Sequence, residues 1–472
     1  MVTPDSKAAM PRSIRDRGSG AEPNASSRVP PWLSSLPRHW AVTSLSRLTT
    51  SRCDGPFGSG LKFENYRDSG RRVIRLQNIG SAHFVDSNAA FISEDYYQGE
   101  LGDHGVQSGD LLIAGLGDEG HPVGRACVAP DSLGPAMVKA DVFRFRLDPR
   151  LVHPAFLAHH LSATAPAFAA VSTTGSTRAR VNLSRMAARP VGVPAVRQQR
   201  AIADYLDRET ERIDALVAKK QRLIELLQEK RTALISHAVT KGLDPDVPMK
   251  DSGIAWLARV PANWQVLPLR RALTGIEQGW SPECEGRTVE SDEWGVLKVG
   301  CVSGGSFVDA LNKALPSGTL NRPSLEVQVG DVLMSRANGS EELVGSAAFV
   351  HNCRPRLMLP DLMYRLIPDR STLDAEFLAT ALSTPHVRAQ IACTLSGSAG
   401  LARKLRQSAV RNLVIPVPPI EQQRTILRQM HRENALLDDL TSAVHHVIAR
   451  LREYRSALIT AAVTGQIDVG ER

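Results

Sequence analysis

The sequence predicts an α+β protein: two repeated units of mixed strand and helix, each followed by a long helix, with the two long helices paired as an antiparallel coiled coil. Three observations support this fold class. A long segment of the chain occurs twice, and each copy ends in a heptad pattern. The segment before each heptad pattern consists of short apolar runs separated by Gly and Pro.

The repeat is clearest in the second part of each copy. Gln198-Gln199-Arg200 returns as Gln422-Gln423-Arg424, and the segment from Arg231 to Ile235 returns as Arg455 to Ile459, with one constant offset that we call the long offset. Trp40 returns as Trp264 at the long offset too. Gly109-Asp110 returns as Gly330-Asp331 at a slightly smaller offset, the short offset, which indicates small insertions within the globular part. A repeat of this length indicates a duplicated domain rather than a solenoid.

Both heptad segments are predicted to be single long helices. Neither contains Pro or Gly between residues 198 and 240 or between residues 422 and 464, and Gly242 and Gly465 follow the expected last turns. At ~1.5 Å per residue each helix is roughly 65 Å long, which favours a partner helix over burial in an ordinary domain. Two rows are predicted to form the seam. One is Leu206, Ile213, Lys220, Leu227 and Leu234, with Met430, Leu437, Val444, Leu451 and Leu458. The other is Ile202, Glu209, Leu216, Leu223 and Lys230, with Ile426, Glu433, Leu440, Val447 and Tyr454.

The globular segments are predicted to mix short strands and short helices. Strands are expected at 73–76, 110–114, 126–129, 296–299 and 331–334, and helices at 154–163 and 375–382. Proline-rich stretches at 190–194 and 416–419 are expected to end a strand and begin each long helix.

Composition limits the function classes. A formal net charge of +8 and a pI near 9.3 favour an anionic partner. The six cysteines form no Cys-x-x-Cys pair, which disfavours zinc or a disulfide framework and fits a reducing cytoplasm. No apolar run reaches the length of roughly 18 residues that predicts a membrane span. Residues 1–29, rich in Ser, Pro, Arg and Ala, are expected to be a disordered extension.

Three motifs together resemble the specificity subunit of type I restriction–modification systems. They are the opening from Asp251-Ser252-Gly253-Ile254 to Trp264, the proline-rich run into Glu421-Gln422-Gln423, and the ending Ala461-Ala462-Val463-Thr464-Gly465-Gln466-Ile467-Asp468. The resemblance covers about residues 30–470. It implies target-recognition domains at 30–193 and 242–415, each reading one half of a split DNA site. It also implies spacer helices at 194–241 and 416–472, the latter with a C-terminal tail.

The resemblance further implies a non-catalytic subunit that binds no cofactor of its own. Two methyltransferase subunits would dock on the helices and bind the methyl donor, and restriction subunits would join where they exist. Because the two globular segments share few polar residues, the two half-sites are expected to differ in sequence.

Candidate DNA-binding residues fall in three matched places: the end of an early strand, the turn after the Gly-Asp strand, and a small basic loop before the proline-rich stretch. Arg and Lys neutralise phosphates, while Arg, Gln and Asn also match base edges. The candidates are Arg75, Gln77, Asn78, Ser176, Arg178, Arg180, Asn182, Lys298, Arg336, Asn338, Ser398, Arg403, Lys404 and Arg406. The same residue types also form solvated turns and cap local backbone, and this alternative remains open.

Other functions find weaker support. Gly115-Leu116-Gly117-Asp118-Glu119-Gly120 matches a nucleotide-binding fingerprint, but His121-Pro122 follows where a helix should begin. Adjacent histidines at 159–160 and 445–446 point apart on a helix, so neither pair suits a shared metal. A coiled-coil scaffold without DNA readout and a self-contained restriction enzyme are the two rival interpretations. The duplicated globular segments disfavour the first, and the absence of nuclease and methylase motifs disfavours the second.

Overall fold

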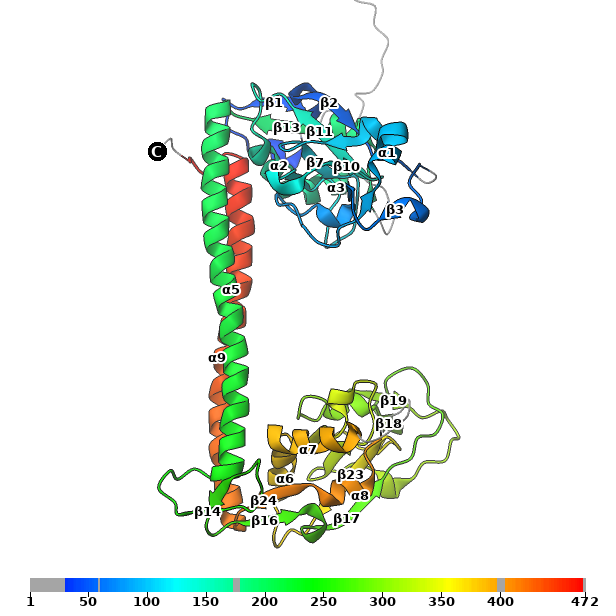
Figure 1. Cartoon of the computed structure of the whole chain (residues 1–472), viewed down its shortest axis with the longest axis vertical. Coiled ribbons are helices and arrows are strands. Elements are labelled where there is room, and N and C mark those ends of the chain that lie inside the picture. Colours follow the sequence, from blue (N-terminus) through cyan, green and yellow to red (C-terminus); the bar gives the residue numbers. More distant parts are fainter. Residues whose placement is uncertain (1–29, 58–59, 173–178, 397–403, 470–472) are drawn as a thin grey trace, which may run out of the picture. The chain divides into compact units, whose positions relative to one another are not determined.

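A computed structural model describes residues 30–57, 60–172, 179–396 and 404–469. Contacts divide the chain into two compact units. The first comprises Met1–Leu216 with Ala449–Arg472, and the second comprises Val217–Ile448. Each unit therefore holds one globular part together with portions of both long helices (Figure 1).

The first unit contains thirteen strands and four short helices within its described residues, followed by the start of a long helix. The strands are β1 (Ala41–Ser44), β2 (Thr49–Cys53), β3 (Tyr66–Arg67), β4 (Arg71–Ile74), β5 (Phe91–Ile92), β6 (Gly105–Val106), β7 (Leu111–Ala114), β8 (Leu116–Gly117), β9 (Ala126–Val128), β10 (Ala136–Val138), β11 (Val142–Leu147), β12 (Ala179–Arg180) and β13 (Pro190–Val193). The helices are α1 (Glu94–Tyr96), α2 (Pro154–Ala163), α3 (Ala165–Ser172), α4 (Leu183–Ala187) and the long α5 (Val196–Lys241). The strands form sheets of order β2-β11-β7-β9 and β3-β5-β4-β10-β6, with the separate pairs β1-β13 and β12-β8.

The second unit has a similar inventory. Its strands are β14 (Met249–Asp251), β15 (Arg259–Pro261), β16 (Gln265–Pro268), β17 (Leu273–Gln278), β18 (Gly295–Leu297), β19 (Asn312–Ala314), β20 (Val332–Ser335), β21 (Ala347–Phe349), β22 (Leu357–Met358), β23 (Met363–Pro368) and β24 (Val414–Val417). Its helices are α6 (Ala375–Leu382), α7 (Pro385–Ser396), α8 (Gln407–Asn412) and the long α9 (Ile420–Val463). The sheets have orders β17-β23-β20-β21, β19-β18-β22, β16-β24 and β14-β15.

Repeated sequence segments form sheets of the same order. β2-β11-β7-β9 in the first unit corresponds to β17-β23-β20-β21 in the second. The register agrees as well, because Leu112 pairs with Arg144, and their counterparts at the short offset, Leu333 and Arg365, also pair. The strand before each long helix pairs with an early strand, β13 with β1 and β24 with β16.

The two short helices expected at 154–163 and 375–382 are confirmed as α2 and α6. The first predicted strand runs too long, because β4 ends at Ile74 and residues 76–78 form a 3-10 turn. A 3-10 turn also follows β18, over residues 299–302. The residues before these turns are Arg75 and Lys298, so Lys298 corresponds to Arg75 in the structure.

Both predicted long helices are present, and a glycine with left-handed backbone lies one or two residues after the end of each. The φ angle is +79° at Gly242 and +69° at Gly465, values that an L side chain adopts only with strain. The helix ends pack into the globular parts. In the second unit Ala238 and Val239 from α5, with Ile426 and Met430 from α9, join one core with Trp264. Within the described ranges, no helix is both long enough and apolar enough to cross a bilayer.

One of the two predicted heptad rows is largely buried, and the other is fully buried only at its first residues, Ile202 and Ile426. Leu206, Ile213 and Leu227 are buried on α5, as are Met430, Leu437, Val444 and Leu458 on α9. In the second row, however, Leu216, Leu440, Val447 and Tyr454 are 40–56 % exposed. The second buried row lies one residue later, at Ala203 and Thr210 on α5 and at Leu427 and Ile448 on α9. Because this row includes small and polar side chains, a search for large apolar residues at heptad spacing does not find it.

Two ion pairs join the long helices at matched positions. In the first unit Arg455 Nε lies 3.0 Å from Asp214 Oδ1, and in the second unit Arg231 pairs with Asp438. The long offset relates Arg455 to Arg231, and it also relates Asp438 to Asp214. Each unit therefore repeats the same cross-helix contact with the roles of α5 and α9 exchanged.

Candidate nucleic-acid interface

The Gly-Asp motif begins a buried strand in each unit and fixes the turn before it. The carboxylate of Asp110 accepts the backbone N–H of Gln107 at 2.8 Å and two guanidinium bonds from Arg146 at 2.9 Å. Asp331 accepts the backbone N–H of Gln328 at 3.0 Å, and Arg365 Nε lies 3.0 Å from its carboxylate. The motif therefore shapes the turn, and its aspartate is committed to structural contacts.

The chain after this strand meets the chain after the basic loop in the same way in both units. In the first unit β8 pairs with β12, with Leu116 opposite Arg180. In the second unit an isolated bridge joins Ala337 to Lys404. Ala337 is the counterpart of Leu116 at the short offset, and Lys404 is the counterpart of Arg180 at the long offset. Two of the three candidate places, far apart in sequence, are thus adjacent in each unit.

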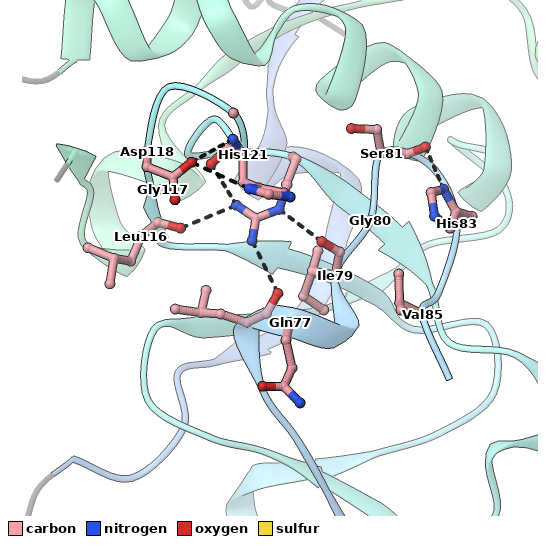
Figure 2. A pocket seen from close by; sticks show the side chains of 13 residues that line it. Gln77, Ile79, Gly80, Ser81, His83, Val85, Leu116, Gly117, Asp118 and His121 are labelled. Carbon is pink, nitrogen blue, oxygen red and sulfur yellow. Dashed lines mark hydrogen bonds and ion pairs between the residues drawn. The ribbon is translucent and has the colours of Figure 1, made fainter. Parts of the chain in front are cut away.

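In the first unit this junction borders a cavity of about 700 Å³ (Figure 2). One wall is the segment from Leu76 to Val85, and the other is the turn from Leu116 to His121. Figure 2 shows Asp118 and His121 on the turn, with Gln77, Ser81 and His83 on the other segment.

Arg125 holds the two walls together. Its guanidinium donates to five carbonyl oxygens at 2.8–3.3 Å, those of Leu76, Ile79, Leu116, His121 and Pro122. Arg125 is only 5 % exposed, and burial lowers its pKa, yet an arginine remains a cation at neutral pH. This buried cation therefore fixes the shape of the cavity from behind.

The prediction for Asn78 as a base-reading residue is contradicted by its surroundings. Asn78 is 1 % exposed, and its amide nitrogen donates to the carbonyls of Val85 and Ser87 at 2.9 and 3.1 Å. Its amide oxygen accepts the backbone N–H of Arg75 at 2.9 Å. Both ends of the amide are therefore used to hold the 3-10 turn, which is the backbone-capping alternative that the sequence left open.

The two neighbours of Asn78 in the candidate set are more accessible. Gln77 is exposed and lines the cavity. Arg75 is half-buried, and its guanidinium donates to the carbonyl of Asn88, so a DNA contact would use its other donors.

Arg180 and Asn182 lie on the described side of the first basic loop. Arg180 is exposed, donates from Nε to Asp141 at 2.8 Å, and has its guanidinium 5.1 Å from the centre of the Phe57 ring. Asn182 is exposed, but its side-chain oxygen accepts the backbone N–H of Arg185 at 2.8 Å and caps α4. Ser176 and Arg178 lie outside the described residues.

In the second unit some candidate side chains already contact other groups of the protein, whereas others are exposed. Arg336 is half-buried, with its guanidinium 5.7 Å from the centre of the Tyr364 ring. Asn338 is half-buried, and its side-chain oxygen accepts the backbone N–H of Ser340 at 3.3 Å. Lys404 and Arg406 are exposed, and Arg406 precedes the first residue of α8. Lys298 is half-buried at the start of its 3-10 turn. Ser398 and Arg403 lie outside the described residues.

Several polar residues of the first cavity were not among the predicted site residues. Asp118 and His121 belong to the glycine-rich turn, whose only recognisable sequence pattern is an incomplete nucleotide-binding motif. Ser81 and His83 follow the 3-10 turn and carry no recognisable pattern. Over the part of the chain that the structure describes, no group of three His, Cys, Asp or Glu side chains is arranged to hold a metal ion.

Known proteins with similar sequences are specificity subunits of restriction enzymes. No protein-family model matches the chain. The type I restriction enzyme EcoEI specificity subunit of Escherichia coli is 25 % identical over 242 residues, which cover 51 % of this chain and 40 % of that relative. The EcoKI specificity subunit of Escherichia coli strain K12 is 24 % identical over 446 residues, 92 % of this chain and 90 % of that relative. The StySPI specificity subunit of Salmonella potsdam is 20 % identical over 441 residues, 92 % of this chain and 90 % of that relative.

Solved structures share the fold. One, described as the structural basis of complex assembly and conformational transition of the type I R-M system, has a TM-score of 0.66 and 15 % identity, with 92 % of this chain and 99 % of that chain covered. The HsdS subunit from Thermoanaerobacter tengcongensis has a TM-score of 0.52 and 15 % identity, with 92 % and 98 % covered. The resemblance to type I restriction–modification specificity subunits that the motifs predicted is therefore confirmed by both the curated relatives and the fold.

Proposed function

We propose that this chain is the DNA-recognition subunit of a type I restriction–modification complex. It recognises a bipartite site on double-stranded DNA and directs methyltransferase subunits, and restriction subunits where they exist, to that site. The observation that carries the proposal is the repeated junction at Leu116–Arg180 and Ala337–Lys404, which puts a cation at the same place in two similar units. The curated relatives support it, since their names describe specificity subunits of type I restriction enzymes.

The proposed target-recognition domains are residues 30–193 and 242–415. In the first, Arg75, Gln77, Arg180 and Asn182 are the described residues proposed to contact DNA. In the second, they are Lys298, Arg336, Asn338, Lys404 and Arg406. Ser176, Arg178, Ser398 and Arg403 extend the same two basic loops in sequence. Arginine and lysine supply affinity through phosphates, and base-edge contacts supply the sequence preference.

The two domains are proposed to read different sequences. At matched positions of the junction, Arg180 corresponds to Lys404, and these two cations are not equivalent. Arginine presents a planar fork that can bind guanine in two places, whereas lysine presents a single point charge. Gln77 corresponds to Gly300, which has no side chain to reach a base. A chain with two unlike reading surfaces suits an asymmetric site.

We propose that α5 and α9 pair as an antiparallel coiled coil that spaces the two domains. Residues 194–241 and 416–472 carry this role. Support comes from the buried rows on both helices and from the reciprocal ion pairs of Arg231 with Asp438 and Arg455 with Asp214. These half-exposed pairs contribute little stability, roughly 0–1 kcal/mol each, but they favour one register over a slipped one.

The same helices are proposed to carry the methyltransferase dock. On α9 within the second unit, Leu436, Leu440 and Val447 are 64, 46 and 42 % exposed. Their spacing of four and seven residues puts them on one face of the helix. Exposed apolar side chains in a row are typical of a surface that a partner covers. Because the repeat supplies two helices, two methyltransferase subunits are the proposed stoichiometry.

The proposal is tested by purifying the chain with and without its candidate methyltransferase subunits and measuring binding to random duplexes at two salt concentrations. DNA recognition through phosphates predicts that affinity falls steeply as salt rises, with a log–log slope close to the number of neutralised phosphates. An affinity that does not change with salt would favour the alternative, a coiled-coil scaffold that brings proteins together without reading DNA.

A further inference from the structure

The turn from Leu116 to His121 in the first unit presents a carboxylate at the edge of the proposed DNA surface. Asp118 is 60 % exposed in its side chain and lines the cavity beside β8, the strand that pairs with Arg180. Most exposed candidates on this surface are cations or amides. An exposed carboxylate here is unfavourable near phosphates, so its position needs a separate reason.

The turn holds this carboxylate in one place. Asp118 Oδ1 accepts the backbone N–H of His121 at 2.8 Å, and the His121 ring nitrogen Nδ1 lies 3.4 Å from the same oxygen. The His121 N–H holds the pKa of Asp118 below its usual range, so the group is ionised at neutral pH. Arg125 fixes the turn from behind through the carbonyls of Leu116, His121 and Pro122. The backbone contacts use only part of the acceptor capacity of a carboxylate, which has about four lone-pair sites.

The edges of DNA bases offer few donors to such an acceptor. In the major groove they are the exocyclic amino groups of cytosine, N4, and adenine, N6. Gln77 also lines the cavity and is exposed, but its amide points away from the Asp118 turn (Figure 2). A fixed acceptor such as Asp118 suits an amino-bearing base edge and disfavours one that carries only acceptors, as guanine does in that groove.

We propose that Asp118 is a specificity-determining residue that accepts a hydrogen bond from the exocyclic amino group of a cytosine or adenine in the half-site read by the first unit. The inference rests on the proposed DNA-recognition function. The second unit lacks the device, because the counterpart of Asp118 at the short offset is Gly339 and the position matched to Gln77 is Gly300. The amino-group contact therefore belongs to one half-site only.

The test is to sequence the methylated sites produced by the full complex carrying Asp118→Asn, Asp118→Ala or the control Glu119→Gln. Glu119 is exposed on the same turn but does not line the cavity. Asp118→Asn keeps an oxygen for the His121 N–H, so the turn should retain its shape while the charge is lost. Loss of one base contact should reduce discrimination at a single position by roughly 5- to 150-fold, in one half-site, with Glu119→Gln unchanged. The identity of the relaxed position, C or A, then names the base.

Two outcomes overturn the inference. The first is an unchanged site with both Asp118 variants. The second is tighter binding of both variants to all duplexes without any change in sequence preference, which would mean that Asp118 only repels phosphates. A wild-type complex that shows no sequence preference at all would instead contradict the proposed function, so the two failures are distinguishable.

Discussion

His160 connects three segments of the first unit through one imidazole ring. Its Nδ1 lies 2.9 Å from the carbonyl oxygen of Val463, the last residue of α9, and its Nε2 accepts the backbone N–H of Gly192 at 3.4 Å. Both contacts require the neutral ring with the proton on Nδ1. Burial lowers the pKa of His160 to about 4, and the nearby buried cation Arg189 acts in the same direction.

Acid should therefore destabilise the first unit. The folded pKa of His160 lies below the unfolded value of about 6.5, so the stabilisation is complete above pH 6.5 and is lost as pH falls toward 4. The full loss is about 3 kcal/mol, of which about 2 kcal/mol should appear by pH 5. Urea unfolding at pH 7.5 and pH 5 measures it. His160→Asn should show a smaller loss than the wild type, and His445→Asn, at an exposed position on α9, should match the wild type. Equal pH dependence in the wild type and His160→Asn would contradict this assignment.

Arg406 is an exposed cation among the described residues of the second unit. Its substitution tests the proposed DNA surface of that unit directly. Arg406→Ala should weaken binding by ~1–3 kcal/mol and relax one position if the guanidinium reads a base. If it binds a phosphate, affinity should fall for all sequences alike and the salt slope should decrease by about one. Arg370→Ala, at another exposed position of the same unit, controls for the loss of one charge. A loss of affinity equal to that of the control would remove Arg406 from the interface.

Residue types and local spacing predicted which segments recur better than the role of each residue. The sequence singled out Arg180, Lys404 and the turn after the Gly-Asp strand, and the structure pairs Arg180 with Leu116 and Lys404 with Ala337. The sequence assigned Asn78 to DNA, because an exposed amide and a buried capping amide have the same letter in a sequence. It did not single out Asp118, because the position of that turn depends on long-range packing: Arg125 joins the carbonyl of Leu116 on the turn to those of Leu76 and Ile79.

At the scale of elements, one glutamine in each unit ties a long helix to its globular part. Gln199 is fully buried; its side chain accepts the backbone N–H of His153 and donates to the carbonyls of Leu151 and Pro194. Gln423, also fully buried, makes the same three bonds with Asp374, Thr372 and Pro418. The amide therefore joins the start of the helix to the loop before α2 or α6 and to the proline-rich stretch.

Replacing this glutamine with an apolar side chain of similar size should weaken the attachment of the long helix to its globular part. Gln199→Leu leaves a buried N–H and two buried carbonyls without their partner, at a cost of about 3 kcal/mol. The free energy of unfolding, measured with urea, should fall by that amount. Gln198→Leu, at the half-exposed neighbouring position, should change it by less than about 1 kcal/mol. Similar losses in the two variants would show that the amide contacts are not specific.

Heptad spacing predicted the two helices but only one of their buried rows. Large apolar residues at 216, 440, 447 and 454 indicated a seam, whereas the structure leaves them exposed and buries a row with Ala203 and Thr210. Apolarity alone cannot separate a residue that faces the other helix from one that faces a further partner, because both sites favour the same side chains. The error is thus informative, since Leu440 and Val447 of the exposed row also belong to the proposed methyltransferase dock.

At the scale of the whole molecule, the duplication in the sequence has counterparts in the structure. The two sequence offsets relate one four-stranded sheet of each unit in strand order and register, and they relate the reciprocal ion pairs. A duplicated chain differs from a homodimer because each half can change its reading surface independently. The contacts that make the halves alike, such as Gln199 and Gln423, lie at the joints. The residues that differ, such as Asp118 against Gly339, lie on the proposed DNA surfaces.

If the helices act as a spacer, their length should set the distance between half-sites. Deleting residues 219–225 and 443–449 removes one heptad from each helix at positions matched by the long offset. Seven residues are two turns to within about 20°, so the buried rows stay in register while the helices shorten by ~10 Å. This length equals the rise of about three base pairs, and binding to duplexes of varied half-site separation should favour a spacer shortened by that number. Binding is the readout because the deletion removes Val447 of the proposed methyltransferase dock. Replacing the same heptads with other coiled-coil heptads of equal length should leave the preferred spacer unchanged. A shortened pair that still prefers the original spacer would mean that the half-site distance is set by something other than α5 and α9.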